Sequence, residues 1–200
     1  MSKSKDLHGN APDKSKVALL LIDMISDFEF PDGEKLFKHA LPMAKKLLSL
    51  KKKAKKFGVP IIYVNDNFGR WQSNFNNLLE HALDESVRGS EISTILKPED
   101  DDYFVLKPKH SGFFSTTLEV LLEYLEVNTL ILTGVTTDIC ILFTANDAYV
   151  RDFNLFIPSD CAAAINKKDH QHTLKFAERV LKVNTQLSTS IDFGKLKSER

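Results

Sequence analysis

The sequence predicts an α/β protein: a three-layer α/β/α architecture with a five- or six-stranded, mostly parallel sheet. Short unbroken apolar runs recur along the chain, as expected for strands that are buried on both faces. Segments with helical periodicity separate several of these runs. The length of 200 residues lets a single domain bury roughly 70% of its unfolded surface, so one core can form without metals or disulfides.

The predicted strands are runs rich in Val, Ile, Leu, Tyr and Phe. They occupy residues 17–22, 60–65, 103–106, 129–133 and 154–158, with a weaker candidate at 185–188. A helix is predicted where apolar residues recur at steps of three and four between Met43 and Phe57, and Gly58 can end it. Further helices are predicted within 115–125, 138–151 and 169–181. Alternating strands and helices predict a parallel sheet that is covered on both sides.

Composition limits the domain organisation, compartment and partners. We expect a polar N-terminal tail at 1–16, one domain at 17–192 and a polar C-terminal tail at 193–200. The chain opens without an apolar signal segment and has two cysteines, Cys140 and Cys161, which predicts a reduced, cytoplasmic setting. No run approaches the roughly 20 apolar residues that span a bilayer.

Charge gives no reason to expect a nucleic-acid or membrane partner. Lysine plus arginine equal aspartate plus glutamate at 27 each, so there is no net field. We interpret the lysines between 45 and 56 as the solvated face of the first helix. The expected partners are therefore a small-molecule substrate and other copies of the chain.

Polar residues follow the predicted strands, at the edge of a parallel sheet where ligands usually bind. They are Asp23, Asp66, Lys107, Gly134 and Asp160. This order brings a carboxylate and a lysine to a shared rim.

Cys140 lies where the strand at 129–133 turns into a helix. If Thr137 or Asp138 caps that helix, Cys140 lies in its first turn. The positive end of a helix stabilises a thiolate and an oxyanion, which favours a nucleophile. Local sequence alone instead favours an inert buried thiol, since free cysteines are often buried and no histidine base is nearby.

Several segments together resemble the isochorismatase-like cysteine hydrolases, the Rossmann-like superfamily that includes nicotinamidases and N-carbamoyl amidohydrolases. The segments are ALLLIDMISDF at 18–28, VLKPKHSGFFSTTL at 105–118, LILTGVTTDICILFTANDA at 130–148 and PSDCAAA at 158–164. The resemblance implies that Asp23, Lys107 and Cys140 form a catalytic triad.

The resemblance also implies a mechanism and an assembly. Asp23 would act as base, Lys107 would favour the thiolate, and Cys140 would attack an amide-type carbonyl to form a thioester. Backbone N–H groups of Thr136 and Cys140 would form the oxyanion hole, with a cis peptide between Val135 and Thr136. Members of the superfamily commonly form homodimers or homotetramers.

Departures from the nicotinamidase pattern decide whether a metal site is expected and which residues are expected to line the substrate pocket. Nicotinamidases carry Asp-x-His where this chain has Asp66, Asn67 and Phe68, so we expect neither a metal site nor a cofactor. His170 and His172 are interpreted as surface residues. The residues expected to line the substrate pocket are Phe28, Asn67, Phe68, Trp71 and Phe113, although ordinary packing explains each aromatic equally well.

Two other functions stay open on sequence grounds. One is an isochorismatase-type ether hydrolase that does not use Cys140. The other is a catalytically silent binding protein on the same fold, because fold alone does not imply function.

Overall fold

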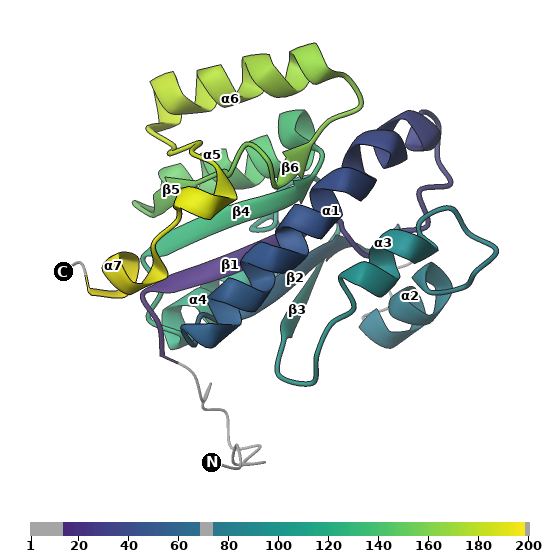
Figure 1. Ribbon diagram of the computed structural model, residues 1–200. Coiled ribbons are helices and arrows are strands. Elements are labelled where there is room, and N and C mark those ends of the chain that lie inside the picture. Colours follow the sequence, from purple (N-terminus) through teal and green to yellow (C-terminus); the bar gives the residue numbers. More distant parts are fainter. Residues whose placement is uncertain (1–13, 69–73, 199–200) are drawn as a thin grey trace.

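The computed structural model describes residues 14–68 and 74–198, which form a parallel six-stranded sheet between two helical layers (Figure 1). The sheet order is β3-β2-β1-β4-β5, and β6 pairs with β4. The strands are Val17–Ile22 (β1), Ile61–Asp66 (β2), Tyr103–Lys107 (β3), Thr129–Val135 (β4), Asn154–Phe156 (β5) and Ala162–Ala163 (β6). The predicted α/β fold class is confirmed.

Helices occupy the connections between the strands. They are Gly33–Lys56 (α1), Phe75–Ala82 (α2), Ser90–Ile95 (α3), Leu118–Tyr124 (α4), Leu142–Tyr149 (α5), Lys167–Leu181 (α6) and Phe193–Ser198 (α7), with a π-helix at Thr137–Ile141 (η1) and a 3₁₀ helix at Ser188–Ser190 (η2). No helix in the described ranges is long and apolar enough to cross a bilayer.

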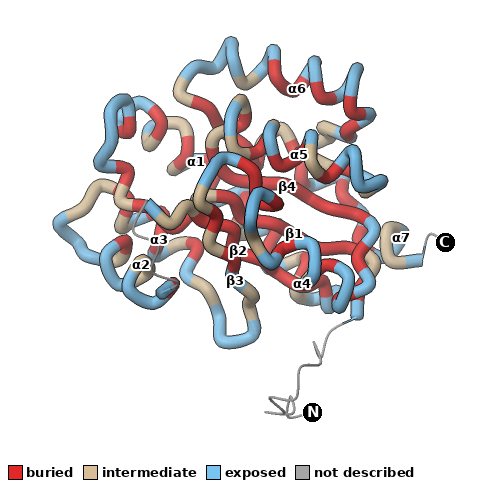
Figure 2. Tube along the Cα trace, turned by 180° about the vertical axis from the view of Figure 1, so that it is seen from behind, coloured by how far each residue is buried: buried red, intermediate tan, exposed pale blue. Residues whose placement is uncertain are grey.

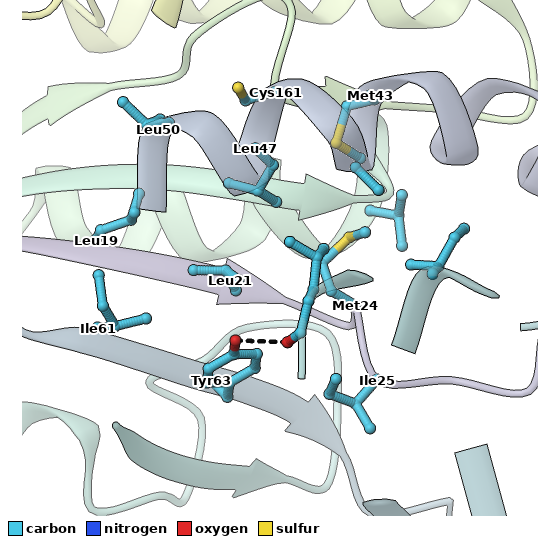
Figure 3. Packing of buried hydrophobic residues seen from close by; sticks show 14 of the residues in the cluster. Leu19, Leu21, Met24, Ile25, Met43, Leu47, Leu50, Ile61, Tyr63 and Cys161 are labelled. Carbon is cyan, nitrogen blue, oxygen red and sulfur yellow. Dashed lines mark hydrogen bonds between the residues drawn. The ribbon is translucent and has the colours of Figure 1, made fainter. Parts of the chain in front are cut away.

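Side-chain alternation along β1 generates the two halves of the core. Val17, Leu19 and Leu21 face the layer that contains α1, α2, α3 and α7. The intervening residues, Ala18, Leu20 and Ile22, face α4, α5 and α6. Every residue of β1 is fully buried, which explains the unbroken apolar run (Figure 2). Figure 3 shows part of the first cluster, which includes Leu47 and Leu50 of α1 together with Leu19 and Ile61.

Several elements differ from the sequence prediction. The stretch 185–188 forms no strand; it leads into η2, and the sixth strand is β6 instead. The helices α2 and α3 between β2 and β3 were not predicted. Within the expected C-terminal tail, α7 forms and its Phe193 is fully buried against the first cluster.

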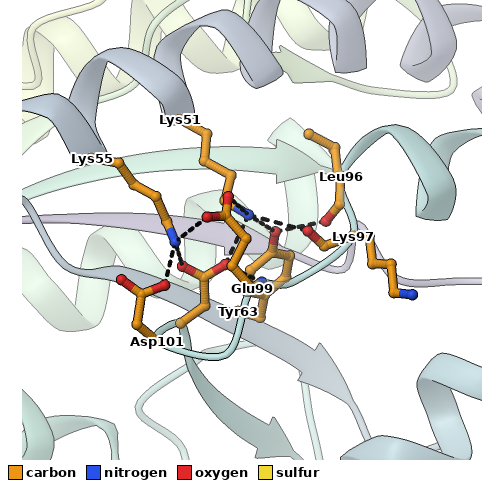
Figure 4. Close-up of polar contacts among 8 residues, drawn as sticks. Lys51, Lys55, Tyr63, Leu96, Lys97, Glu99 and Asp101 are labelled. Carbon is orange, nitrogen blue, oxygen red and sulfur yellow. Dashed lines mark hydrogen bonds and ion pairs between the residues drawn. The ribbon is translucent and has the colours of Figure 1, made fainter. Parts of the chain in front are cut away.

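The lysines of α1 are not all solvated, which corrects the sequence interpretation. Lys51 is 2% exposed and its Nζ lies 2.8 Å from Asp102, whose side chain is 1% exposed. Lys51 also donates hydrogen bonds to Tyr63 and to the Lys97 carbonyl (Figure 4). Burial raises the pKa of the Tyr63 hydroxyl, and Asp102 raises it further. This polar cluster holds α1 against the segment 97–102, which precedes β3.

Candidate active site

The parallel register brings Asp23, Asp66 and Lys107 to one edge of the sheet. Ile22 is aligned with Val64 on one neighbour and with Gly134 on the other, so Asp23 lies just beyond the centre of that edge. Asp66 is aligned with Lys107 on the outer strand. The ends of three strands therefore contribute polar groups to the same place, as predicted.

Lys107 connects the predicted residues into one cluster. Its Nζ lies 3.0 Å from Asp23 Oδ2, 3.6 Å from Cys140 Sγ and 3.6 Å from Asp66 Oδ2. The Cys140 thiol also hydrogen-bonds to the Asp23 carboxylate. The structure thus brings together Asp23, Lys107 and Cys140.

The backbone around Asp23 holds its carboxylate in place. Asp23 has a φ of 52°, a left-handed conformation that non-glycine residues adopt rarely and often at functional sites. Its N–H donates to the Val64 carbonyl, and its Oδ1 accepts from the Asp66 N–H at 2.8 Å. These bonds on both sides fix the orientation of the side chain.

Burial sets the protonation of the cluster. It raises the pKa of Cys140 to about 12; Asp23 raises it as well, while Lys107 acts in the opposite direction. Burial also raises the pKa of Asp23, against the effect of Lys107. For Lys107, burial would lower the pKa, but Asp23, Cys140 and Asp66 raise it. These effects favour the neutral thiol at Cys140, because burial and the Asp23 charge outweigh the opposing effect of Lys107.

The turn that carries Cys140 is tightly packed. Gly134 has a φ of 111°, and a Cβ there would lie 2.0 Å from the Ile22 carbonyl oxygen, so glycine is required. The peptide between Val135 and Thr136 is cis, and η1 follows directly. Neither expected cap forms: the helix begins after Thr136 without a side-chain cap, and Thr137 Oγ1 is 2.8 Å from His170 Nδ1.

His170 is consequently not a free surface residue, in contrast to the sequence interpretation. Its ring is half-buried, contacts Thr137 and hydrogen-bonds to the Ser159 backbone. Burial lowers its pKa, which favours the neutral ring. His172 is exposed, as expected.

A cavity of about 350 Å³ opens beside Cys140. Two of the expected pocket residues, Phe28 and Phe68, line it. Asn67 lines a neighbouring cavity instead, and Trp71 lies outside the described residues. Phe113 is not in the cavity, because its ring packs against Phe153 and beneath the Arg151 guanidinium.

Most other lining residues were not predicted, although Asp66 was expected at this edge of the sheet and Thr136 in the oxyanion hole. They are mainly apolar, with polar groups near the cysteine: Ser26, Phe30, Pro31, Leu36, Asn65, Asp66, His110, Val135, Thr136, Ile139 and Ile165. Phe30, Pro31, Leu36 and Ile165 come from segments that no chemical motif marks. The sequence does mark Asn65, because it is the polar residue at the end of an apolar run. It does not show which face of the sheet the side chain occupies.

The residues that match a metal site in nicotinamidases do not fit one here. Phe68 offers no ligand, and Asp66 Oδ1 accepts from the Phe68 N–H. His81 Nε2 is 2.9 Å from Asp27 Oδ2 and is held by that pairing. Within 14–68 and 74–198, no three His, Cys, Asp or Glu side chains are grouped as ligands.

Comparison with known proteins identifies the family of the chain. The Isochorismatase domain model matches residues 17–190. The uncharacterised isochorismatase family protein YaaI of Bacillus subtilis is 44% identical over 168 residues, 84% of this chain and 92% of that protein. Nicotinamidase 3 of Arabidopsis thaliana is 27% identical and aligns over 82% of this chain and 81% of its own.

A solved structure shares the fold. N-carbamoylsarcosine amidase from Thermoplasma acidophilum superposes with a TM-score of 0.68 at 24% identity, covering 88% of this chain and 99% of its own. With the family model spanning nearly the whole described region, the chain belongs to the isochorismatase family of hydrolases.

Proposed function

We propose that this protein is a cysteine-dependent amidohydrolase that cleaves an amide-type C–N bond in a small carboxamide, carbamoyl or ureido compound. The observation that carries the proposal is the position of Lys107 Nζ, 3.0 Å from Asp23 and 3.6 Å from Cys140. A base, a cation and a nucleophile in contact are the elements of covalent acyl transfer. The names of Nicotinamidase 3 and N-carbamoylsarcosine amidase support the same bond type.

The first half-reaction begins from the neutral thiol. As Cys140 Sγ attacks the carbonyl carbon, Asp23 takes the thiol proton, and the charge of Lys107 stabilises the developing thiolate. The carbonyl electrons move to oxygen. Backbone N–H groups of Thr136 and Cys140 would hold that oxyanion, a contribution typically worth a hundredfold or more in rate.

The first half-reaction ends when the nitrogen leaves, and the second, hydrolysis of the thioester, returns the enzyme to its starting state. Protonated Asp23 gives its proton to the departing nitrogen as the C–N bond breaks, which leaves a thioester on Cys140 and releases ammonia or an amine. Asp23 then takes a proton from water as the water attacks the thioester. The proton returns to the Cys140 thiolate when the acid leaves.

The compartment and assembly belong to the same proposal. Cys140 and Cys161 are both free thiols, which suits a reducing cytoplasm. Phe30 and Phe68 line the cavity and are 40% and 48% exposed, so a second subunit of a homodimer or homotetramer could cover its entrance.

Ammonia release from a panel of carboxamides, N-carbamoyl compounds and ureides tests the proposal. We expect wild type and Cys161→Ala to hydrolyse at least one class with a chelator present, and Cys140→Ala to be inactive. Hydrolysis that survives Cys140→Ala would instead favour non-covalent chemistry. A folded wild type that cleaves no member of the panel would argue for a binding role.

A further inference from the structure

Asn65, near the end of β2, has a buried amide whose orientation is fixed. The residue is 1% exposed, and its Nδ2 donates to the Ile25 carbonyl at 2.8 Å. Because a carbonyl can only accept, Nδ2 must face Ile25 and Oδ1 must point elsewhere. Oδ1 is buried and has no hydrogen-bond partner in the described part of the chain.

An unpaired buried acceptor calls for an explanation, since nearly all such groups in native proteins are paired. Asn65 lines the cavity that contains Cys140. Thr136 Oγ1, in the same cavity wall, is likewise buried and unpaired among the described residues. Ser26 differs, because its hydroxyl already accepts from the Phe28 N–H. Two of the five buried side-chain atoms that lack a hydrogen-bond partner in the described ranges thus belong to residues that line the cavity where a substrate would bind.

Much of the cavity wall is apolar. Phe28 and Leu36 line the same cavity and are at most 1% exposed, and Ile165 adds a third apolar wall. A charged group would be poorly solvated in this region, and an anionic group would also face the negative end of the Asn65 amide. A neutral O–H or N–H donor would satisfy Oδ1 without these costs.

We propose that Asn65 Oδ1 is a specificity determinant that accepts a hydrogen bond from the acyl part of the substrate. The substrate class is then a small aryl or cyclic amide that carries one neutral hydroxyl or amino donor. This inference rests on the proposed amidohydrolase function, because it places the acyl group over Cys140. Sites that hydrogen-bond a substrate donor discriminate strongly against analogues that lack it.

Aldehydes allow this specificity to be measured without turnover. An aromatic aldehyde adds reversibly to a thiol: the S–C bond forms, and the thiol proton passes to the carbonyl oxygen. We would compare benzaldehyde with its 2-, 3- and 4-hydroxy isomers, and would use protection of Cys140 against iodoacetamide to obtain each Kd. Wild type should bind at least one hydroxy isomer roughly tenfold or more tightly than benzaldehyde.

Asn65→Leu removes both polar atoms but keeps the branched shape, and should bring that ratio close to one. The ratio is measured within one variant, so it does not depend on the fraction of folded protein. Equal binding of all four aldehydes by wild type, or an unchanged ratio in Asn65→Leu, would overturn the role of Asn65 and leave the hydrolase proposal standing. No binding of any aldehyde by a wild type that hydrolyses an amide or ureide would overturn the aryl substrate class and leave the hydrolase proposal standing.

Discussion

Lys107 Nζ and Asp23 Oδ2 form an ion pair of 3.0 Å. Lys107 ends β3 and Asp23 follows β1, so the pair joins two strands that β2 separates. Lys107 is fully buried, and Asp66 of β2 contacts both partners, with its N–H bonded to Asp23 and its carboxylate near Lys107. The register of three strands therefore positions the cation beside the cysteine.

Replacing Lys107 with Met should lower the reactivity of Cys140. Without the cation, the thiol pKa rises further, and each unit of pKa lowers the thiolate fraction about tenfold. We expect at least a tenfold slower reaction with iodoacetamide at pH 8 and a larger loss of hydrolysis. Lys109→Met is the matched control, since Lys109 is exposed two residues away. Equal alkylation rates in wild type and Lys107→Met would contradict the assigned role.

Hydrolysis should depend on pH through Asp23 on the acidic side. Asp23 must be ionised to accept the proton, and burial raises its pKa despite Lys107. The acid limb of kcat/KM should therefore lie above the ordinary value near pH 4, with activity rising as Asp23 deprotonates. Because the pKa of Cys140 is about 12, its alkylation should show no plateau through pH 9. Glutathione in the same buffers is the control, and a Cys140 profile that levels off below pH 9 would argue against a neutral resting thiol.

His170→Leu should slow hydrolysis with little change in KM. The substitution removes the hydrogen bond to Thr137, a fully buried residue of η1, and so loosens the turn that carries Cys140. Displacing reacting groups by about 1 Å can cost roughly 100-fold in rate. His172→Leu, at an exposed position on the same helix, should behave as wild type. If His170→Leu keeps the kcat of wild type, as His172→Leu should, then His170 does not position the turn.

Lys51→Met should destabilise the fold. It leaves the buried Asp102 carboxylate with one fewer cation and removes the donor to Tyr63. Breaking a buried pair costs about 3 kcal/mol, although Lys55 remains within 2.8 Å of Asp102 and reduces that cost. Lys52→Met, at an exposed position, should change stability by less than about 0.5 kcal/mol. Urea unfolding of both variants measures the difference.

The sheet and the reactive cluster were predictable because each depends on local patterns. Strands buried on both faces need unbroken apolar runs, and parallel order places the residues after them at one edge. The positions of Asp23, Lys107 and Cys140 follow from those two facts together with the family resemblance.

Features that depend on tertiary packing were not predictable. Lys51 has the same local pattern as the exposed lysines around it, and only the position of Asp102 shows that it is buried. Phe113 follows a glycine turn, and its direction is decided by Phe153 and Arg151. The short helices α2 and α3 carry too few apolar repeats to be recognised.

The most direct test of the account is to trap the acyl group on Cys140 with hydroxylamine during turnover. A thioester transfers its acyl group to hydroxylamine and regenerates the thiol, so wild type should form the hydroxamate, or the hydroxyurea from a carbamoyl substrate. Cys140→Ala should form neither product. Continued C–N cleavage by wild type without any such product, at hydroxylamine concentrations that trap a model thioester, would contradict covalent catalysis by Cys140.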